Sequence, residues 1–476
     1  MDLKETKRLF DADSPAAEAV REYTASLAAR LGHRPGVYAR TFGCQQNEAD
    51  SERLVGMAVS MGYEAVDCPE RAHLILFNTC AVREHAELKA LSKTGALKQY
   101  KEQNPDLIIG LCGCMVAQEH RMNKIKGSYP YVDFLFGTAT HASLPEYLEQ
   151  EIKRGRRAFY ADPPSPVITE GMPVRRESSF KAWVSVMYGC NNFCTYCIVP
   201  YVRGRERSRA KEDILDEVRE LVAKGYREIT LLGQNVNSYG KDRYEGYGFA
   251  DLLEDICRIK GEYWIRFMTS HPKDATSRLI EVMAAHSTPE SAPRIVRNFH
   301  LPLQSGSDRV LKAMNRHYDR ARYLSLIDEL RATMPDISLS TDMIVAFPTE
   351  TEEDFEQTLD ILRRVRYDAF FSFIFSPRPG TPAAEMPLVP EEQAKDRFAR
   401  MLAVQNEISA EKNRELIGQI HTVLVEGRSK TDPDKLTGRN EHNRLIHFSG
   451  EDSLIGSFAR VRIEQAETYC VIGRLM

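Results

Sequence analysis

The chain has 476 residues, of which 42% are hydrophobic and 28% are charged, and its formal net charge is −4. This length exceeds what one hydrophobic core usually fills, so we expect two to four domains of ordinary soluble composition. The slightly acidic balance excludes binding of nucleic acid through overall positive charge and leaves only local basic patches for that purpose.

No apolar run reaches the ~18 residues that predict a membrane span, and no secretory signal pattern begins the chain. We therefore expect a protein without a membrane partner. Ten cysteines in such a chain indicate a reducing compartment. The sequence thus predicts a cytoplasmic protein that uses thiols for metal or redox chemistry.

Residues 1–34 form an Ala- and Glu-rich amino-terminal extension, in which we expect a short helix and no chemistry. From residue 35 to 150, short apolar runs alternate with helical patterns, as in an α/β domain whose parallel sheet is covered by helices. The expected strands are 37–42, 73–78, 106–111 and 133–136, with helices that include 51–61 and 81–100. Ligands of such sheets gather at the carboxyl ends of the strands.

A cysteine follows each of the first three predicted strands: Cys44, Cys80 and Cys114. Three thiols brought to one sheet edge by three separate loops are typical of a ligand site. The alternative is a role as small buried hydrophobic residues, which we expect for Cys68, Cys257 and Cys470. Cys112 is ambiguous, because it lies two residues before Cys114 and could face the same way.

Residues 151–178 are polar and rich in proline, which predicts a linker, and a second α/β domain is expected over 179–415. Its predicted strands are 183–187, 228–232, 264–269, 298–303, 338–347 and 370–375. The helices between them are expected near 214–224, 251–260, 278–286, 323–334 and 352–365. Six strand–helix units suggest an incomplete barrel, with its chemistry on the loops at the strand carboxyl ends.

Several of these loops are polar or Gly-rich directly after an apolar strand, as binding loops should be: 233–237, 269–272 and 304–307. Taken singly, each could also be a plain turn. A binding role is favoured because every one of these polar loops directly follows a predicted strand.

The loop after the first barrel strand carries Cys190, Cys194 and Cys197. Three thiolates on a 4Fe–4S cluster leave one iron without a protein ligand, and that iron can bind a small molecule. Zinc is the alternative, because Cys-x-x-Cys pairs also build tetrahedral sites. Zinc would need a fourth ligand, and no His or further Cys lies between residues 142 and 256. The spacing favours iron–sulfur.

Three arginines follow this loop at alternate positions, Arg203, Arg205 and Arg207. Such a basic run can contact phosphates, and a solvated surface is the alternative. Farther on, 391–416 is expected to form a long polar helix. The tail from 416 to 476 is expected to form a small β-barrel from strands 422–426, 445–448, 458–463 and 469–473. The segment 436–440 is expected as a loop, so that Arg439 and Arg444 become loop groups.

Residues 189–206, GCNNFCTYCIVPYVRGRE, carry the cysteine signature of radical S-adenosylmethionine enzymes. They resemble the methylthiotransferase branch, and most of all the tRNA 2-methylthioadenosine synthases of the MiaB type. Residues 41–47, 77–84 and 113–118 are similar to the amino-terminal domain of that family, and the tail resembles the RNA-binding TRAM domain. Ala346 and Thr349 depart from the family pattern, which usually has Gly at both positions.

The resemblance implies two 4Fe–4S clusters, one held by Cys44, Cys80 and Cys114 and one by Cys190, Cys194 and Cys197, with Cys112 outside the ligand set. It also implies two molecules of S-adenosylmethionine per turnover, one as methyl donor and one as radical source. The residues expected to bind this cofactor are Tyr196, Gly233, Gln234, Asn235 and Gln304. No catalytic residue beyond the cluster ligands is implied.

The implied reaction adds a methylthio group to carbon 2 of isopentenyl-adenosine next to a tRNA anticodon. The implied partners are the tRNA anticodon stem-loop and an external one-electron donor such as a flavodoxin or ferredoxin, with the protein a monomer. The expected RNA-binding residues are Arg203, Arg205, Arg207, Arg439 and Arg444. One alternative is a sister methylthiotransferase that acts on threonylcarbamoyl-adenosine of tRNA or on a ribosomal-protein aspartate. The alternative from another class is an RNA-binding protein with structural metal sites.

Overall fold

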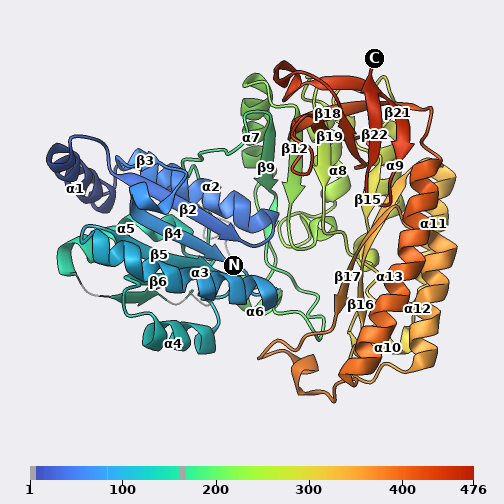
Figure 1. Cartoon of the computed structure of the whole chain (residues 1–476), viewed down its shortest axis with the longest axis horizontal. Helices are drawn as coiled ribbons and strands as arrows, with labels where there is room; N and C mark the ends of the chain where they lie inside the picture. Colours follow the sequence, from blue (N-terminus) through green and yellow to red (C-terminus); the bar gives the residue numbers. More distant parts are fainter. Residues whose placement is uncertain (1–6, 83, 156, 161, 163–166) are drawn as a thin grey trace. The chain divides into compact units, whose positions relative to one another are not determined.

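The computed structural model describes residues 7–82, 84–155, 157–160, 162 and 167–476 (Figure 1). The chain forms two compact units. The first comprises Met1–Glu177, Met187–Asn191 and Cys197–Arg209, and the second comprises Ser178–Val186, Asn192–Tyr196 and Ala210–Met476. Among the described residues, no helix combines the length and the apolar character that a membrane crossing requires.

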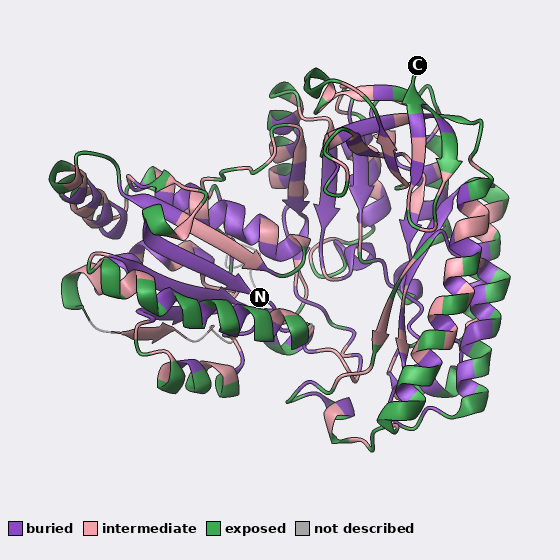
Figure 2. Cartoon of the chain, in the orientation of Figure 1, coloured by how far each residue is buried: buried purple, intermediate pink, exposed green. Residues whose placement is uncertain are grey.

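The first unit is built on a six-stranded parallel sheet in the order β3-β2-β4-β5-β6-β7. Its strands are β2 (Gly36–Phe42), β3 (Glu64–Ala65), β4 (Ala72–Thr79), β5 (Ile108–Gly113), β6 (Phe134–Phe136) and β7 (Ala158–Tyr160). Every residue of β4 is buried, because this strand lies inside the sheet with helices on both faces (Figure 2). The predicted parallel α/β architecture is confirmed.

Two apolar cores cover the two faces of this sheet. On one face, side chains of α1 (Pro15–Leu31), α2 (Gln45–Ser60) and α5 (Leu144–Arg154) pack against alternate strand residues such as Ile108 and Cys112. On the other face, α3 (Glu84–Gln103) and α4 (Glu119–Ser128) pack against the intervening residues. The short helix expected in the amino-terminal extension is therefore α1, and its buried face belongs to the first core.

The segment 151–178 differs from the linker that the sequence predicts. It contributes the sheet strand β7 and the strand β8 (Ile168–Glu170), which pairs in parallel with β1 (Lys7–Leu9). Glu52 of α2 also forms an ion pair with Arg176, at 3.0 Å. These strands have three residues each, too few for a periodic pattern to show. The prolines of 163–166 on which the linker prediction rested lie outside the described residues.

The second unit contains the predicted partial barrel as two parallel sheets, β14-β13-β12-β9 and β15-β16-β17. Its strands are β9 (Lys181–Ser185), β12 (Glu228–Leu232), β13 (Trp264–Phe267), β14 (Arg294–Ile295), β15 (Asn298–His300), β16 (Ser338–Val345) and β17 (Ala369–Ile374). The intervening helices are α7 (Lys211–Ala223), α8 (Phe249–Cys257), α9 (Ser277–Ala285), α11 (Arg320–Thr333) and α12 (Glu352–Val365). The six predicted strands are confirmed, and the two-residue β14 was not predicted.

After the predicted long helix, α13 (Glu391–Arg414), the tail closes a five-stranded barrel in the order β18-β19-β20-β22-β21. Its strands are β18 (Ile420–Arg428), β19 (Leu436–Asn440), β20 (Leu445–Phe448), β21 (Phe458–Ala466) and β22 (Val471–Leu475). The prediction of a loop at 436–440 was wrong, because β19 pairs with both β18 and β20. Its polar sequence lacks the apolar alternation of a strand, although Leu436 and Asn440 are buried.

Candidate cluster and cofactor sites

The first unit brings three thiols together at the carboxyl edge of its sheet. Cys44 caps the start of α2 directly after β2, Cys80 follows β4, and Cys114 follows β5, and these three strands are neighbours. Burial raises the pKa of Cys114 to about 12, and the neighbouring thiols of Cys80 and Cys44 act in the same direction. The Cys114 thiol thus lies within electrostatic reach of the Cys80 and Cys44 thiols.

Cys112 takes no part in this arrangement. It is fully buried in the apolar core beneath α1, α2 and α5, and burial raises the pKa of its thiol well above the usual value. Gly113 separates it from Cys114, because its φ of +96° turns the chain out of β5. A Cβ at Gly113 would lie 2.4 Å from the Asn78 Oδ1, so no other residue fits this turn without a shift.

Each of the three edge thiols has a polar neighbour within the first unit. The Cys44 thiol donates a hydrogen bond to Asn47 Oδ1 at 3.3 Å, and the Val82 N–H donates to Cys80 Sγ at 3.3 Å. The Arg203 guanidinium lies beside Cys114, where its charge and a hydrogen bond oppose the effect of burial on the thiol pKa. The donors directed at the sulfurs of Cys80 and Cys114 stabilise thiolates, which are the form of cysteine that binds metals.

The loop 190–197 is fixed at several points. In the first unit, the Cys190 N–H donates to Gly204 O at 3.1 Å. The first unit also holds Ile198, next to Cys197, in an apolar group with Ala81 and Cys114. In the second unit, the Thr195 N–H donates to Met314 O at 3.1 Å.

A buried arginine accompanies the middle cysteine of this loop. Arg316 Nη1 donates to Cys194 Sγ at 3.4 Å and to the Tyr196 hydroxyl at 3.3 Å. Its Nη2 donates to Pro302 O at 2.9 Å, which fixes the guanidinium in place. The sequence alone predicts no role for Arg316, because a lone arginine does not reveal its burial.

The residues predicted to bind S-adenosylmethionine lie on the strand-end loops of the second unit. Gly233 and Asn235 are buried after β12 and Gln234 is half-buried. Asn235 Nδ2 donates to Asp274 Oδ2 at 2.7 Å. Gln304 is buried with a φ of +76°, and its backbone bonds to β16 through Asp342 O at 2.8 Å. Gln304 thus lies in the loop that follows β15, beside β16.

Four residues on two of these loops carry buried polar atoms that have no hydrogen-bond partner among the described residues. They are Asn235 Oδ1, both amide atoms of Asn237, Ser270 Oγ and His271 Nε2. The two loops lie side by side, because the Val236 N–H donates to Thr269 O at 3.2 Å. Most buried polar atoms have a partner, so a group of unpartnered ones on two adjacent loops fits a site that a polar ligand completes. A polar cofactor fits the surface that these two loops form.

His271 is held in one tautomer. The Lys273 N–H donates to His271 Nδ1 at 3.2 Å, so that nitrogen is the acceptor and the ring proton sits on Nε2. Burial and the nearby Arg316 lower the pKa of His271 strongly, which keeps the ring neutral. The sequence flagged the loop 269–272 and not this residue individually, because a lone histidine does not reveal its burial.

In the described part of the chain, no three His, Cys, Asp or Glu side chains come together as the ligands of one metal ion would.

The five predicted RNA-binding arginines differ in their surroundings. Arg203 is buried and ion-paired with Asp50 at 3.0 Å, which leaves it no access to phosphate in this structure. Arg205 is exposed and Arg207 is half-buried. Arg439 pairs with Glu426 at 2.7 Å, and Arg444 pairs with Asp368 at 2.6 Å. The prediction for Arg203 is therefore revised, because the last residue of α6 (Val199–Arg203) turns inward.

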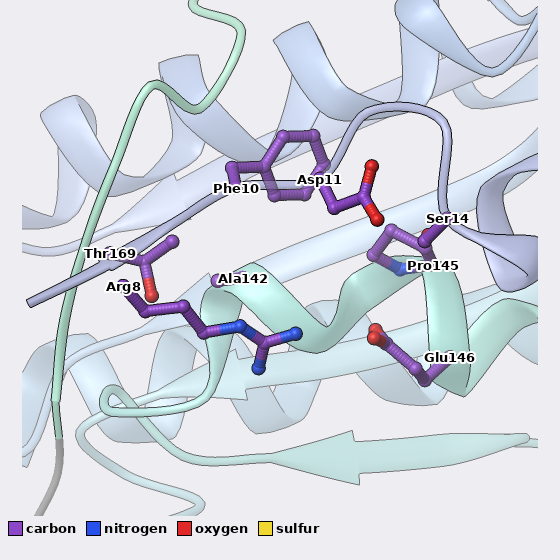
Figure 3. Close-up of a pocket in the computed structure, with 8 residues that line it drawn as sticks. All are labelled: Arg8, Phe10, Asp11, Ser14, Ala142, Pro145, Glu146 and Thr169. Carbon is purple, nitrogen blue, oxygen red and sulfur yellow. The ribbon is translucent and has the colours of Figure 1, made fainter.

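The other cysteines are only partly as predicted. Cys257 is buried on α8, whereas Cys68 and Cys470 are half-buried. The first unit also has a shallow pocket between β1, the start of α1 and α5, into which Arg8 and Glu146 point (Figure 3). No cysteine lines this pocket, so we assign it no part in the chemistry.

Comparisons with known proteins agree with the geometry. Family models match residues 36–137 (Uncharacterized protein family UPF0004), 184–362 (Radical SAM superfamily) and 414–476 (TRAM domain). A tRNA-2-methylthio-N(6)-dimethylallyladenosine synthase of Carboxydothermus hydrogenoformans is 50% identical over 92% of this chain and 99% of the relative. The protein of the same name from Clostridium beijerinckii is 48% identical over 92% and 95%.

A solved structure shares the fold at low sequence identity. The radical S-adenosylmethionine methyltransferase TsrM from Kitasatospora setae aligns with a TM-score of 0.55 at 13% identity. The alignment covers 73% of this chain and 75% of that one.

Proposed function

Because the chain belongs to the tRNA-2-methylthio-N(6)-dimethylallyladenosine synthase family of the radical SAM superfamily, we propose that it adds a methylthio group to an isopentenyl-modified adenosine of tRNA. The target is carbon 2 of the adenine next to the anticodon. General acid–base chemistry cannot open this unactivated carbon–hydrogen bond at neutral pH. When bound, iron–sulfur clusters and S-adenosylmethionine supply the one-electron chemistry and the sulfur that the reaction needs.

The observation that carries the proposal is the convergence of Cys44, Cys80 and Cys114 at one sheet edge, separate in sequence from the loop 190–197. Two sets of three cysteines fit two clusters with an open iron each. We assign Cys44, Cys80 and Cys114 to the cluster that handles sulfur, and Cys190, Cys194 and Cys197 to the cluster that binds S-adenosylmethionine. One molecule of this cofactor serves as methyl donor and a second as radical source.

The chain's own groups bind and orient the cofactor. Gly233, Gln234 and Asn235 line the end of β12, and Tyr196 and Gln304 complete the predicted set. We add Asn237 and His271, whose unpartnered amide and Nε2–H offer both acceptors and donors to a polar ligand. Arg316 keeps Tyr196 beside Cys194, since its Nη1 donates to both side chains.

We propose that the anticodon stem-loop of tRNA contacts the tail barrel and the exposed part of the basic run. Arg205 and Arg207 remain candidates for phosphate contact, as do Arg439 and Arg444 once their ion pairs open. The protein acts as a cytoplasmic monomer that receives electrons from an external donor such as a flavodoxin or ferredoxin. The electron path requires no membrane.

The division of labour is tested by changing Cys44, Cys80 and Cys114 together to Ala. Anaerobic turnover with isopentenyl-modified tRNA should still yield 5′-deoxyadenosine but no methylthio product. Changing Cys190, Cys194 and Cys197 to Ala should abolish both products, because the S-adenosylmethionine site then lacks its ligands. The Cys112→Ala variant is the matched control and should form product normally.

Two outcomes contradict the proposal. Methylthio-adenosine from the Cys44, Cys80 and Cys114 variant would refute the sulfur-handling role of that site. If tRNA from a strain without the protein lacks a methylthio group on threonylcarbamoyl-adenosine instead, the substrate is that of a sister methylthiotransferase. Mass spectrometry of digested tRNA distinguishes the two nucleosides.

A further inference from the structure

Arg203 occupies an unusual position for a residue of a basic run. It ends α6, and Ile198 just before this helix and Val202 within it pack against Ala81 and Cys114 in the first unit. Its side chain is about 5% exposed and extends toward α2. A guanidinium is almost never buried unless its charge and donors are matched, so the groups around it define its role.

The partners of Arg203 are two residues of α2. Its Nη2 donates to Asp50 Oδ2 at 3.0 Å and to Asn47 Oδ1 at 3.1 Å. Burial acts to raise the pKa of Asp50, but the charges of Arg203, His141 and Arg53 and the hydrogen bond from Gln46 together lower it, which keeps Asp50 ionised. Gln46 Nε2 also donates to Asp50 Oδ1 at 3.2 Å. The carboxylate is thus fixed from two sides.

Asn47 connects this ion pair to the thiols. Its Oδ1 accepts from both Arg203 and the Cys44 thiol, while its Nδ2 donates to Asn78 Oδ1 at 2.8 Å and Thr79 O at 3.0 Å. Thr79 directly precedes Cys80. When Cys44 loses its proton to become a metal ligand, the bond from Arg203 remains and keeps the Asn47 amide in the same orientation.

On the other side, Arg203 faces Cys114. Val202, the neighbour of Arg203 on α6, packs against Cys114, and the guanidinium donates a hydrogen bond to the Cys114 thiol. One buried cation therefore contacts Cys114, shares the Asn47 Oδ1 acceptor with Cys44, and is tied to Cys80 through Asn47 and Thr79. An ion pair that served only to join α6 to α2 would not need these contacts with the thiols.

We propose that Arg203 is a positioning residue of the three-cysteine site, where its fixed positive charge and hydrogen bonds stabilise the anionic cluster that Cys44, Cys80 and Cys114 hold. The inference rests on the proposed function, because it needs a cluster at these thiols. Hydrogen bonds to ligand sulfurs and nearby cations raise the reduction potential of iron–sulfur clusters, because they favour the state with more negative charge.

The test uses the full chain with Cys190, Cys194 and Cys197 changed to Ala, so that only the site of interest can load. Iron and sulfide contents are measured after anaerobic reconstitution, and the midpoint potential is followed by electron paramagnetic resonance during redox titration. In this background, Arg203→Gln should shift the midpoint to a more negative potential and lower the iron content. Arg203→Lys keeps the charge but loses the fork to Asn47 and Asp50, so its midpoint shift should be smaller and its iron loss clear.

Arg209→Gln is the matched control. Arg209 is equally buried and pairs with Glu170 of β8 at 2.7 Å, so its loss should lower thermal stability without moving the midpoint. If both Arg203 variants match the background in iron content and midpoint, Arg203 is a structural ion pair only. If Arg203→Gln does not fold, an unchanged Arg203→Lys protein overturns the inference in the same way.

The background protein with Arg203 intact distinguishes a failure of the proposed function from a failure of the role proposed for Arg203. If it binds no iron with Arg203 intact, the proposed function fails at this site, whatever the variants do. If it binds iron and the Arg203 variants are unaltered, only the role of Arg203 is refuted.

Discussion

The three-cysteine edge of the first unit and the strand-end loops of the second unit are built in opposite ways. At the edge, Asn47, the Val82 N–H and Arg203 already contact or face the sulfurs. On the loops, both amide atoms of Asn237 and the Nε2 of His271 are buried with no partner in the part of the chain that the structure describes. At the edge, Cys80 and Cys114 already accept hydrogen bonds at sulfur, whereas the loops have bonds still to make.

This difference matches the two kinds of ligand that we assign. A resident cluster bound by thiolates needs its ligands held in place before and after loading. A cofactor that is consumed in each turnover must leave, so its site can supply bonds that form only while it is bound. Each unpartnered buried group costs about 1–3 kcal/mol in the empty protein, and ligand binding removes that cost.

The largest expected effect tests whether the strand-end loops of the second unit bind S-adenosylmethionine. His271→Phe removes the Nε2–H donor and leaves an apolar ring of similar size in the same place. We expect binding of S-adenosylmethionine to weaken about 10- to 100-fold, which corresponds to roughly 1–3 kcal/mol for one lost bond to a buried group. Isothermal titration calorimetry on the anaerobically reconstituted protein measures this change.

The cofactor-free stability gives an independent readout of the same variant. The variant loses the unpartnered Nε2–H, which favours the folded state, and also the bond from the Lys273 N–H to Nδ1, so the free energy of unfolding should fall less than for the loss of a fully bonded buried polar group. His286→Phe, at the end of α9, is the control and should leave cofactor affinity unchanged. An unchanged affinity of the His271→Phe variant for S-adenosylmethionine would show that the loop 269–272 does not form part of the cofactor site.

A smaller effect should distinguish the exposed Arg205 from the buried Arg203 by their contributions to tRNA binding. Arg205→Ala should weaken tRNA binding several-fold and reduce the slope of log affinity against log salt by up to about 0.9, the value for one phosphate contact. Arg203→Gln should leave that slope unchanged, because its side chain is buried against α2. Filter binding over a salt series measures both variants. An equal loss of slope in the two would place Arg203 on the RNA surface after all.

The strands that position both sites could be predicted, because buried parallel strands are continuous apolar runs and long helices are periodic. β4 and α12 illustrate this, the latter matching its predicted bounds. The shortest strands could not be predicted, since two or three residues carry no period. β19 was missed because its polar residues pair through the backbone, which sequence patterns do not record.

The residues of the candidate sites likewise fall into those that the sequence can predict and those that it cannot. Cys44, Cys80 and Cys114 were predictable because each follows a recognisable strand, and strand ends converge in a parallel sheet. The inward turn of Arg203 was not, since a run of alternating arginines shows charge but not which member a helix end buries. The unpartnered state of His271 depends on atoms from several elements, so only the folded structure shows it.

The smallest expected effect concerns two residues near the mouth of the barrel. Ala346 and Thr349 have φ values of +55° and +69°, in the left-handed region that disfavours every residue except glycine. The Ala346 N–H donates to Glu350 Oε1 at 2.9 Å, a bond that glycine would keep. The family to which the chain is similar usually has Gly at both positions, which is the residue that this backbone suits.

We therefore expect Ala346→Gly to raise the free energy of unfolding by about 0.5–1 kcal/mol, because relief of the left-handed strain exceeds the added freedom of the unfolded chain. Thr349→Gly should gain less, since it also loses the 3.5 Å contact of Thr349 Oγ1 with Arg309. Ala399→Gly, at an exposed position inside α13, is the control and should lose about 1 kcal/mol. Anaerobic denaturant titration measures all three. A loss in Ala346→Gly as large as that in Ala399→Gly would mean that the loop stores no strain, and that its departure from glycine costs the protein nothing.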